Sequence, residues 1–199
     1  MITSILTRWL SPVSDTRGSQ IVEFAVALPL LVVFVVGIFD FGNAFNIKYK
    51  LTNAVREGAR FAAAQPTSDL SQPTVGTTGS LESVASQVAN NLLTANVNDC
   101  GLSGVANQTV TQPAPLTWTY TTSTGCSGAT LTLTIERGYT FTAPASSIYP
   151  LGLTVEATRV TLSYPYKWQF NRVIQFLVPG GTFPGTSQIS VVSVMQNLH

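Results

Sequence analysis

The chain has 199 residues, of which 10% are charged, and its formal net charge is +1 at pH 7. This length provides one modest domain in addition to a membrane segment. The low and balanced charge excludes the basic surface of a nucleic-acid-binding protein and a polybasic patch for anionic lipid.

The first predicted element is an apolar helix. The segment from Phe24 to Phe39 contains no charged residue and no Asn, Gln, Ser or Thr. As a helix it covers roughly 24 Å, slightly less than the ~30 Å hydrocarbon core of a bilayer. Extension from about residue 21 to about 47 reaches that length, with Glu23 near one end and Asp40 near the other. We predict a membrane-spanning helix with a functional carboxylate at its entry, and Pro29 predicts a kink within it.

Residues 1–18 precede this helix and are too short to form a domain, so we interpret them as a cytoplasmic leader. Charge counting alone indicates the opposite orientation or none, because the leader's Arg8 and Arg17 are outnumbered by basic residues after the apolar block. Those residues are Lys48, Lys50, Arg56 and Arg60. The cysteines and the leader lead us to expect the C-terminal part outside the cytoplasm.

The helix is predicted to continue as an amphipathic helix to about residue 65, where Gln65-Pro66 ends it. Apolar or small residues recur every three or four positions and form one stripe: Ala44, Ile47, Leu51, Val55, Gly58 and Ala62. Gly58 and Ala62 would allow another backbone to approach closely. The opposite side carries Arg56, Glu57 and Arg60, which we interpret as a solvated face with one Glu-Arg pair rather than as a partner contact.

Residues 66–199 have the composition of an exported β-rich domain, being rich in Thr, Ser, Gly and Asn. A linker at 67–79 should precede a second helix that Ser80 caps, with Glu82 in its first turn. Alternating segments predict strands at 116–120, 131–135, 139–141, 153–157, 160–164 and 189–195. The apolar residues of 153–157 and those of 160–164 alternate on opposite parity, which predicts a bulge or kink near Thr158 and Arg159. The elements predict an α+β fold, with the long N-terminal helix packed on an antiparallel sheet and one extra helix.

The two cysteines, Cys100 and Cys126, lie in this β-rich part. A disulfide between them would stabilise the fold by about 3 kcal/mol in an oxidising compartment. The alternative is two unrelated buried thiols.

Several ordered motifs carry a family resemblance. Gly18-Ser19-Gln20-Ile21-Val22-Glu23-Phe24 is followed by Leu28-Pro29-Leu30, by Gly37-Ile38-Phe39-Asp40-Phe41-Gly42 and by Asn53-Ala54-Val55-Arg56-Glu57-Gly58-Ala59-Arg60-Phe61-Ala62. Over about residues 17–63 the chain resembles TadE-like proteins of the tight-adherence (Tad/Flp) pilus system. The resemblance implies a pilin-like fold and a pseudopilin or minor pilin that takes part in pilus assembly. It also implies a single-pass protein of the bacterial inner membrane, and leaves open whether the protein enters the filament, caps its tip or stays at its base.

The resemblance assigns roles to the N-terminal motif. A prepilin peptidase would cut between Gly18 and Ser19, and Phe24 would be the aromatic residue of its recognition motif. Glu23 would then lie one helical turn from a new α-amino group and could pair with it, in the same or a neighbouring subunit. The alternative is that Glu23 marks the water-facing end of an uncleaved anchor. The implied partners are the peptidase, other pilin or pseudopilin subunits, membrane components of the pilus machine and lipid, without nucleic acid or a cofactor.

The sequence does not favour an enzyme. The single histidine is the last residue, His199, and no metal-binding or phosphate-binding motif occurs. Glu136 and Glu156 are interpreted as surface charges rather than a glycosidase pair. The aromatic group Tyr164, Tyr166, Trp168 and Phe170 is either a surface-binding platform or, as we favour, a hydrophobic rim that covers the sheet. The alternative function is a membrane-anchored envelope protein whose β-rich domain binds an external ligand.

Overall fold

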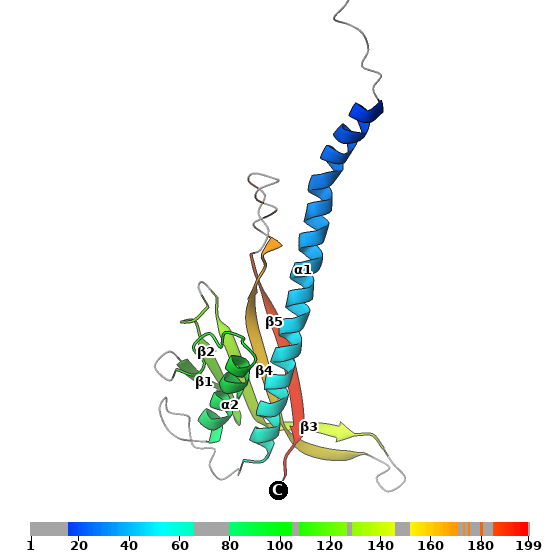
Figure 1. The fold of residues 1–199 in the computed structure, drawn as a ribbon. Coiled ribbons are helices and arrows are strands. Elements are labelled where there is room, and N and C mark those ends of the chain that lie inside the picture. Colours follow the sequence, from blue (N-terminus) through cyan, green and yellow to red (C-terminus); the bar gives the residue numbers. More distant parts are fainter. Residues whose placement is uncertain are drawn as a thin grey trace, which may run out of the picture.

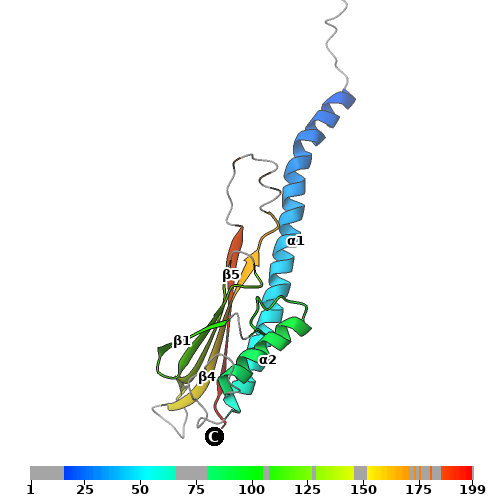
Figure 2. The same ribbon diagram turned by 90° about the vertical axis from the view of Figure 1, so that its left-hand side faces the viewer.

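The computed structural model describes residues 16–65, 80–104, 108–126, 129–145, 152–170, 173, 175, 180 and 185–198. These residues form α1 (Thr16–Ala63), α2 (Ser80–Thr94) and the strands β1 (Gln108–Ala114), β2 (Thr117–Thr122), β3 (Leu131–Ala143), β4 (Leu153–Lys167) and β5 (Thr186–Gln196). Both helices lie on one face of a single antiparallel sheet (Figures 1 and 2). This arrangement confirms the expected α+β fold and has a pilin-like layout. Most of the predicted leader and the linker at 67–79 lie outside the described residues.

The 48 residues of α1 form one helix that continues through Pro29. Its upper part extends beyond the sheet (Figure 1), and Figure 2 shows that the helix axis bends there. Side chains from 21 to 39 are exposed or half-buried, and Asp40 is the first buried residue. Beyond it the stripe predicted from the three- and four-residue spacing faces the core, with Ala44, Leu51, Val55, Gly58 and Ala62 buried and Ile47 half-buried. The helix is therefore apolar on all sides in its first half and amphipathic in its second.

Helix α2 buries its apolar side against α1 and the sheet. Its buried residues are Leu81, Val84, Ala85, Val88, Ala89 and Leu92. After Thr94 the chain turns at Asn96, whose φ of 54° is left-handed, and Val97 N–H donates to Leu92 O at 2.9 Å. An asparagine in this conformation is a common way to end a helix. The side chains of Ser80 and Glu82 lie outside the described part, so the predicted cap stays a prediction.

The sheet has the order β1-β2-β3-β4-β5, and each strand pairs with the next one in the sequence. Alternate residues of β2 and β3 point into the core, among them Trp118, Tyr120, Leu133 and Ile135. The residues between them face away from the helices and are mostly threonines. Thr119 and Thr134, which are paired in register, have their hydroxyl oxygens 3.3 Å apart. The alternation of apolar residues and threonines thus sets the two faces of the sheet.

Strand β1 is not predicted from the sequence. This strand contains Gln108, Pro113 and only one buried side chain, so it lacks the apolar alternation by which strands are recognised. It forms the edge of the sheet and pairs with β2 alone, with a register shift between Thr111 and Ala114. Its position is set by backbone pairing rather than by side-chain burial.

The irregularity predicted near Thr158 and Arg159 of β4 lies instead in the neighbouring strand β3, so the prediction was wrong about the strand that carries it. Glu136 pairs with Arg159 and Tyr139 pairs with Ala157, so Arg137 and Gly138 of β3 lie opposite the single residue Thr158. The extra residue is therefore in β3, and β4 runs without interruption from Leu153 to Lys167. The bulge turns the Arg137 side chain toward the end of α1, where its Nη2 donates to Gln65 O at 2.7 Å. A cation at this end interacts favourably with the helix dipole.

Candidate functional site

The N-terminal motif lies on the part of α1 that extends beyond the domain. Gly18 is within the helix, and no atom lies within 4 Å of the position that a side-chain Cβ would take there. Glu23 and Phe24 are both exposed. Ser19 and Glu23 are four residues apart in α1, so they lie on the same face of the helix. Within the described residues, no hydrogen bond or ion pair engages Glu23, so its carboxylate is available to another group.

The second carboxylate of the apolar helix, Asp40, has the opposite environment. Only 5% of its surface is exposed. Its Oδ1 accepts a hydrogen bond from the Tyr166 hydroxyl at 2.8 Å, and its Oδ2 accepts one from Phe170 N–H, also at 2.8 Å. Asn43, one turn further along α1, donates from Nδ2 to the Tyr166 hydroxyl at 3.2 Å. We call Asp40, Asn43, Tyr166 and Phe170 the Asp40 junction, because together they bind α1 to the end of β4.

Aromatic rings surround the Asp40 junction. Trp168 contacts Phe41 with ring centroids 5.2 Å apart and Tyr166 with centroids 4.9 Å apart, both edge to face. The Trp168 indole Nε1 donates to Ser187 Oγ of β5 at 2.8 Å. Edge-to-face pairs of this kind are favourable beyond the area that they bury. Part of the aromatic group singled out in the sequence thus joins the sheet to α1, as a rim would.

The contact between Asp40 and Tyr166 is not predicted from the sequence. One signal for it is present in the sequence, because Asp40 precedes Ala44 by four positions and so extends the apolar stripe by one turn. An acid in a buried stripe requires hydrogen-bond donors. The donors themselves are 126 and 130 positions away, at Tyr166 and Phe170, and no local pattern indicates them.

The environment of Tyr166 also changes its acidity. Burial and the hydrogen bond to Asp40 raise the pKa of Tyr166 to about 12, although the hydrogen bond from Asn43 acts in the opposite direction. The phenol therefore stays protonated at physiological pH and serves as a hydrogen-bond donor, not as an acid or base. The Asp40 junction therefore holds α1 and the end of β4 together.

Close helix packing occurs at Gly58. A Cβ placed on Gly58 would collide with Cγ2 of Val88, so α2 lies directly against the α1 backbone at this point. Ala62, one turn further, is fully buried. The exposed side of α1 carries Arg56, Glu57 and Arg60, as expected for a solvated face, although no ion pair joins Glu57 to Arg60 in the described structure.

Cys100 and Cys126 are joined by a disulfide in the structure. It connects the turn after α2 to the loop after β2. In the same region the carbonyl of Cys100 accepts hydrogen bonds from the Thr122 hydroxyl at 2.7 Å and from Gly125 N–H at 3.3 Å. A Cβ at Gly125 would lie 2.8 Å from Cys100 Cα, so only glycine fits beside this turn.

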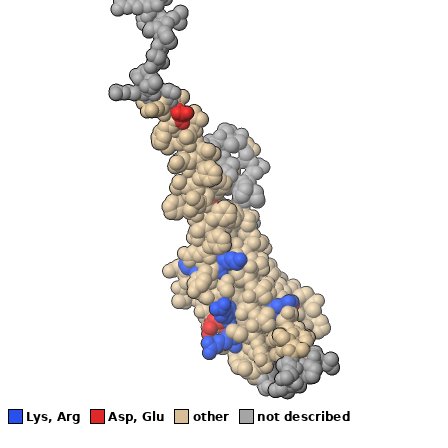
Figure 3. All heavy atoms as spheres, turned by 90° about the vertical axis from the view of Figure 1, so that its right-hand side faces the viewer, with Lys and Arg blue, Asp and Glu red and all other residues tan. Residues whose placement is uncertain are grey.

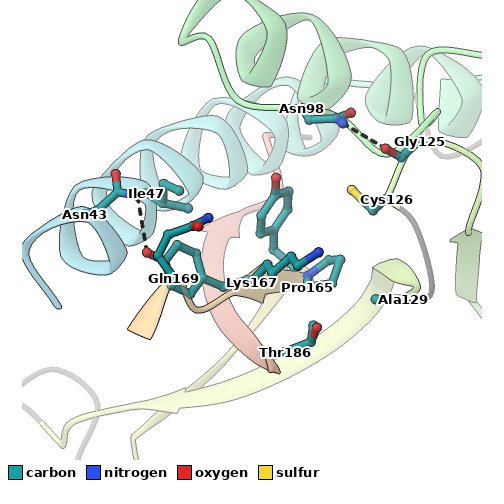
Figure 4. Close-up of a pocket in the computed structure, with 12 residues that line it drawn as sticks. Asn43, Ile47, Asn98, Gly125, Cys126, Ala129, Pro165, Lys167, Gln169 and Thr186 are labelled. Carbon is teal, nitrogen blue, oxygen red and sulfur yellow. Dashed lines mark hydrogen bonds between the residues drawn. The ribbon is translucent and has the colours of Figure 1, made fainter. Parts of the chain in front are cut away.

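A cavity of about 290 Å³ lies between α1, the disulfide loop and the end of β4 (Figure 4). Its described lining includes the side chains of Asn43, Asn98 and Lys167. The amide groups are engaged in the fold, because Asn98 donates to Gly125 O at 2.9 Å and Asn43 donates to Tyr166. Lys167 is the single charged residue of that lining. The cavity thus contains no pairing of a nucleophile with a base.

No group of three potential metal ligands occurs among the residues that the structure describes. Glu136 forms an ion pair with Arg159 from the neighbouring strand, and this partner raises the pKa of Arg159. The Arg159 guanidinium also lies 4.4 Å from the centre of the Tyr139 ring. Glu136 therefore has a structural partner, and Glu156, which pairs with Thr140 in the same two strands, is exposed.

The helix Gln20–Ala63 is long and apolar enough to cross a membrane. Its most apolar stretch has a mean hydropathy of 2.7, and none of that stretch is buried in the protein. A helix of this kind near the N-terminus is consistent with a single-pass membrane anchor.

Comparison with known proteins gives one match. Residues 18–60 match the family model described as TadE-like protein. No curated protein and no solved structure is similar enough to the chain to count as a match. The matched segment contains Gly18, Glu23, Asp40 and Gly58, and so extends from the exposed N-terminal motif to the packing against α2. Over residues 18–60 the chain is therefore similar to TadE-like proteins.

Proposed function

We propose that this protein is a pseudopilin or minor pilin of a Tad/Flp-type pilus, without enzymatic activity of its own. The TadE-like match supports involvement in a Tad pilus system. In this proposal the protein is anchored in the bacterial inner membrane by the apolar part of α1, and the disulfide-containing domain lies outside the cytoplasm. A prepilin peptidase removes residues 1–18.

One observation carries the proposal. Every residue from 21 to 39 is exposed or half-buried, and Asp40 is the first buried residue of α1. A helix with such a surface requires lipid or other apolar helices around it. Pilus assembly offers both environments in succession, first the membrane and then the neighbouring subunits.

Cleavage before Ser19 would change the charge at the start of α1. The new α-amino group is positive and lies at the positive end of the helix dipole, which is unfavourable. Glu23, four residues later on the same face, can neutralise this group in its own subunit or in a neighbouring one. A pair formed between subunits would fix their register, because a carboxylate in an apolar environment is costly without a partner.

The cleavage step is tested by measuring the mass of the protein purified from membranes, with and without an active prepilin peptidase. We expect loss of residues 1–18 only when the peptidase is active. Gly18→Leu should block the cut, and the open space around Gly18 means that this change leaves the fold intact. Gly42→Ala, at another glycine of α1 where an added Cβ would meet no atom outside the helix backbone within 4 Å, is the control and should be cleaved normally. Recovery of the uncleaved chain from cells with active peptidase and normal pili would contradict the proposal.

The role of Glu23 is tested separately with Glu23→Gln. We expect normal membrane insertion and cleavage but impaired pilus assembly, because the amide cannot neutralise the α-amino group. Glu57→Gln makes the same chemical change at an exposed position of the same helix and should assemble normally. Normal piliation with Glu23→Gln would show that Glu23 merely marks the end of the anchor.

A further inference from the structure

Burial of α1 residues begins at Asp40. Every side chain from 21 to 39 is exposed or half-buried, and Asp40 is buried. The rise from Glu23 to Asp40 is about 26 Å along the helix axis, close to the ~30 Å hydrocarbon core of a bilayer. From Asp40 onward α1 is attached to β4, so it cannot be surrounded by lipid on all sides.

The end of the sheet at this level is aromatic. Tyr166 lies next to Lys167, the last residue of β4, and Trp168 comes directly after the strand and packs against Phe41 of α1. Phe41 is nevertheless 59% exposed, and Phe45, one turn further, is 68% exposed. Tryptophan and tyrosine are enriched where a protein crosses from hydrocarbon to water. Exposed phenylalanines beside them extend the apolar surface of the helix onto the domain.

Three apolar hollows connect these surfaces. The one closest to the free part of α1 has a volume of about 550 Å³ and lies against Phe34, Ile38 and Phe45. A second, of about 280 Å³, lies between Gly37, Asp40, Trp168 and Phe170. A third, of about 310 Å³, is bordered by Phe45, Lys48 and Trp168. The hollows therefore begin beside the apolar part of the helix and end at a lysine.

Lys48 is the first cation after residue 17, and it is exposed. Figure 3 shows that on this face the basic side chains lie on the domain. The part of the helix that extends beyond the domain is uncharged except near its far end. A lysine can extend its ammonium group toward phosphates while its methylene chain stays on an apolar surface. This distribution, apolar hollows followed by aromatic rings and then a lysine, matches the order of acyl chains, interface and headgroups in one leaflet.

We propose that the end of the sheet rests on the membrane surface. The phospholipids of the domain-side leaflet fill the hollows around Phe41, Phe45 and Trp168, and their phosphates contact Lys48. The membrane-spanning segment is then about residues 21–39 rather than 21–47, since the Asp40 junction belongs to the domain. This inference rests on the proposed single-pass topology. In addition to that topology, the lipid contacts hold the domain at a fixed depth until the subunit leaves the membrane.

The test measures the depth of Trp168 in the full-length protein reconstituted in vesicles of phosphatidylcholine and phosphatidylglycerol. Fluorescence quenching is recorded for the wild type and for Trp168→Phe, and the difference between them reports on Trp168 without alteration of the buried Trp118. A nitroxide attached to the acyl chain near the headgroup should quench this component at least about two-fold more strongly than one near the chain end, because the Trp168 ring lies close to the interface. Iodide in the water should have little effect.

Quenching by iodide but not by the lipid nitroxides would overturn the proposal. Absence of quenching by either probe at every protein density would also overturn it, because a second copy would then cover the hollows. Flotation of the same vesicles separates this failure from that of the topology. If the protein floats and Trp168 is not quenched, the membrane anchor stands and the contact of the sheet with lipid does not; if the protein does not float, the proposed anchor fails as well.

Discussion

Two carboxylates border the apolar run of α1, and their environments differ completely. Glu23 is exposed, whereas Asp40 is buried and accepts hydrogen bonds from Tyr166 and Phe170. A buried carboxylate is stable only when donors satisfy it, so Asp40 fixes the end of β4 to the helix. Glu23 has no such role in the folded chain, which leaves it for contacts outside the domain.

The contribution of Asp40 is tested with Asp40→Asn. The amide can accept one of the two hydrogen bonds but places an N–H₂ group against the other donor, so we expect a loss of about 1.5–3 kcal/mol in the free energy of unfolding. The measurement is urea denaturation in detergent. Glu57→Gln, the same change at an exposed position, should stay within about 0.5 kcal/mol of the wild type. Equal stability of the two variants would mean that the junction does not hold α1 and β4 together.

Tyr166 makes the stability of the same contact depend on pH. Burial, together with the hydrogen bond to Asp40, raises its pKa to about 12, whereas the phenol of the unfolded chain has a pKa of about 10. Between these values the unfolded chain loses a proton that the folded chain keeps. The stabilisation is therefore fully present below pH 10 and is lost as the pH rises to about 12.

Tyr166→Phe isolates this effect, since phenylalanine does not ionise. We expect the wild type to be more stable than the variant at pH 9, and the difference in unfolding free energy to become smaller at pH 11. Urea denaturation at the two pH values measures it, and comparison of the two proteins removes the contributions of the other tyrosines. A difference that is the same at both pH values would contradict the raised pKa.

At the scale of elements, the contact between α1 and α2 depends on the absence of a side chain. Gly58 in the middle of a helix lowers helix propensity by up to about 1 kcal/mol relative to alanine. Val88 occupies the space where its Cβ would be. The packing of the two helices thus explains a residue that local helix stability disfavours.

Gly58→Ala should therefore destabilise the protein despite its better helix propensity. Overpacking of a core costs about 1–3 kcal/mol, which exceeds the gain in propensity. Gly42→Ala is the matched change in the same helix, and it should be neutral or slightly stabilising because nothing lies within 4 Å of the added methyl group. The midpoint of thermal unfolding distinguishes the two. Val88→Ala combined with Gly58→Ala should recover part of the loss, and an unchanged midpoint for Gly58→Ala alone would show that the helices are not in close contact.

The elements also differ in how much of them could be predicted from the sequence. The buried stripe of α1 could be predicted because the 3.6-residue period relates sequence directly to one face of a helix. The same applies to β3, where threonines alternate with Leu131, Leu133 and Ile135. Strand β1 could not be predicted, since its position depends on backbone pairing along an edge. The Asp40 junction could not be predicted either, because its donors come from residues more than 120 positions away.

At the scale of the whole molecule, α1 is attached to the domain at two separate levels. The Asp40 junction holds one end of the attached part, and at the other end Arg137 and Leu198 bind the carbonyls of Gln65 and Ala63. Between these levels lie roughly 36 Å of helix, and its inner side is part of the main core. The attached half of α1 is therefore a structural element of the domain, while the half before Asp40 makes little contribution to the core.

This division predicts that the domain folds without the first half of α1. A chain that begins at Gly37, one turn ahead of Asp40, keeps every residue of the hydrophobic core. We expect it to be soluble, to form the disulfide between Cys100 and Cys126, and to unfold cooperatively in thermal denaturation followed by circular dichroism. A chain that begins at Val55 lacks the Asp40 junction and Leu51, which is fully buried, so it should fail to fold. Aggregation of the longer chain, or the absence of a cooperative transition, would mean that the domain needs the residues before Gly37 in order to fold.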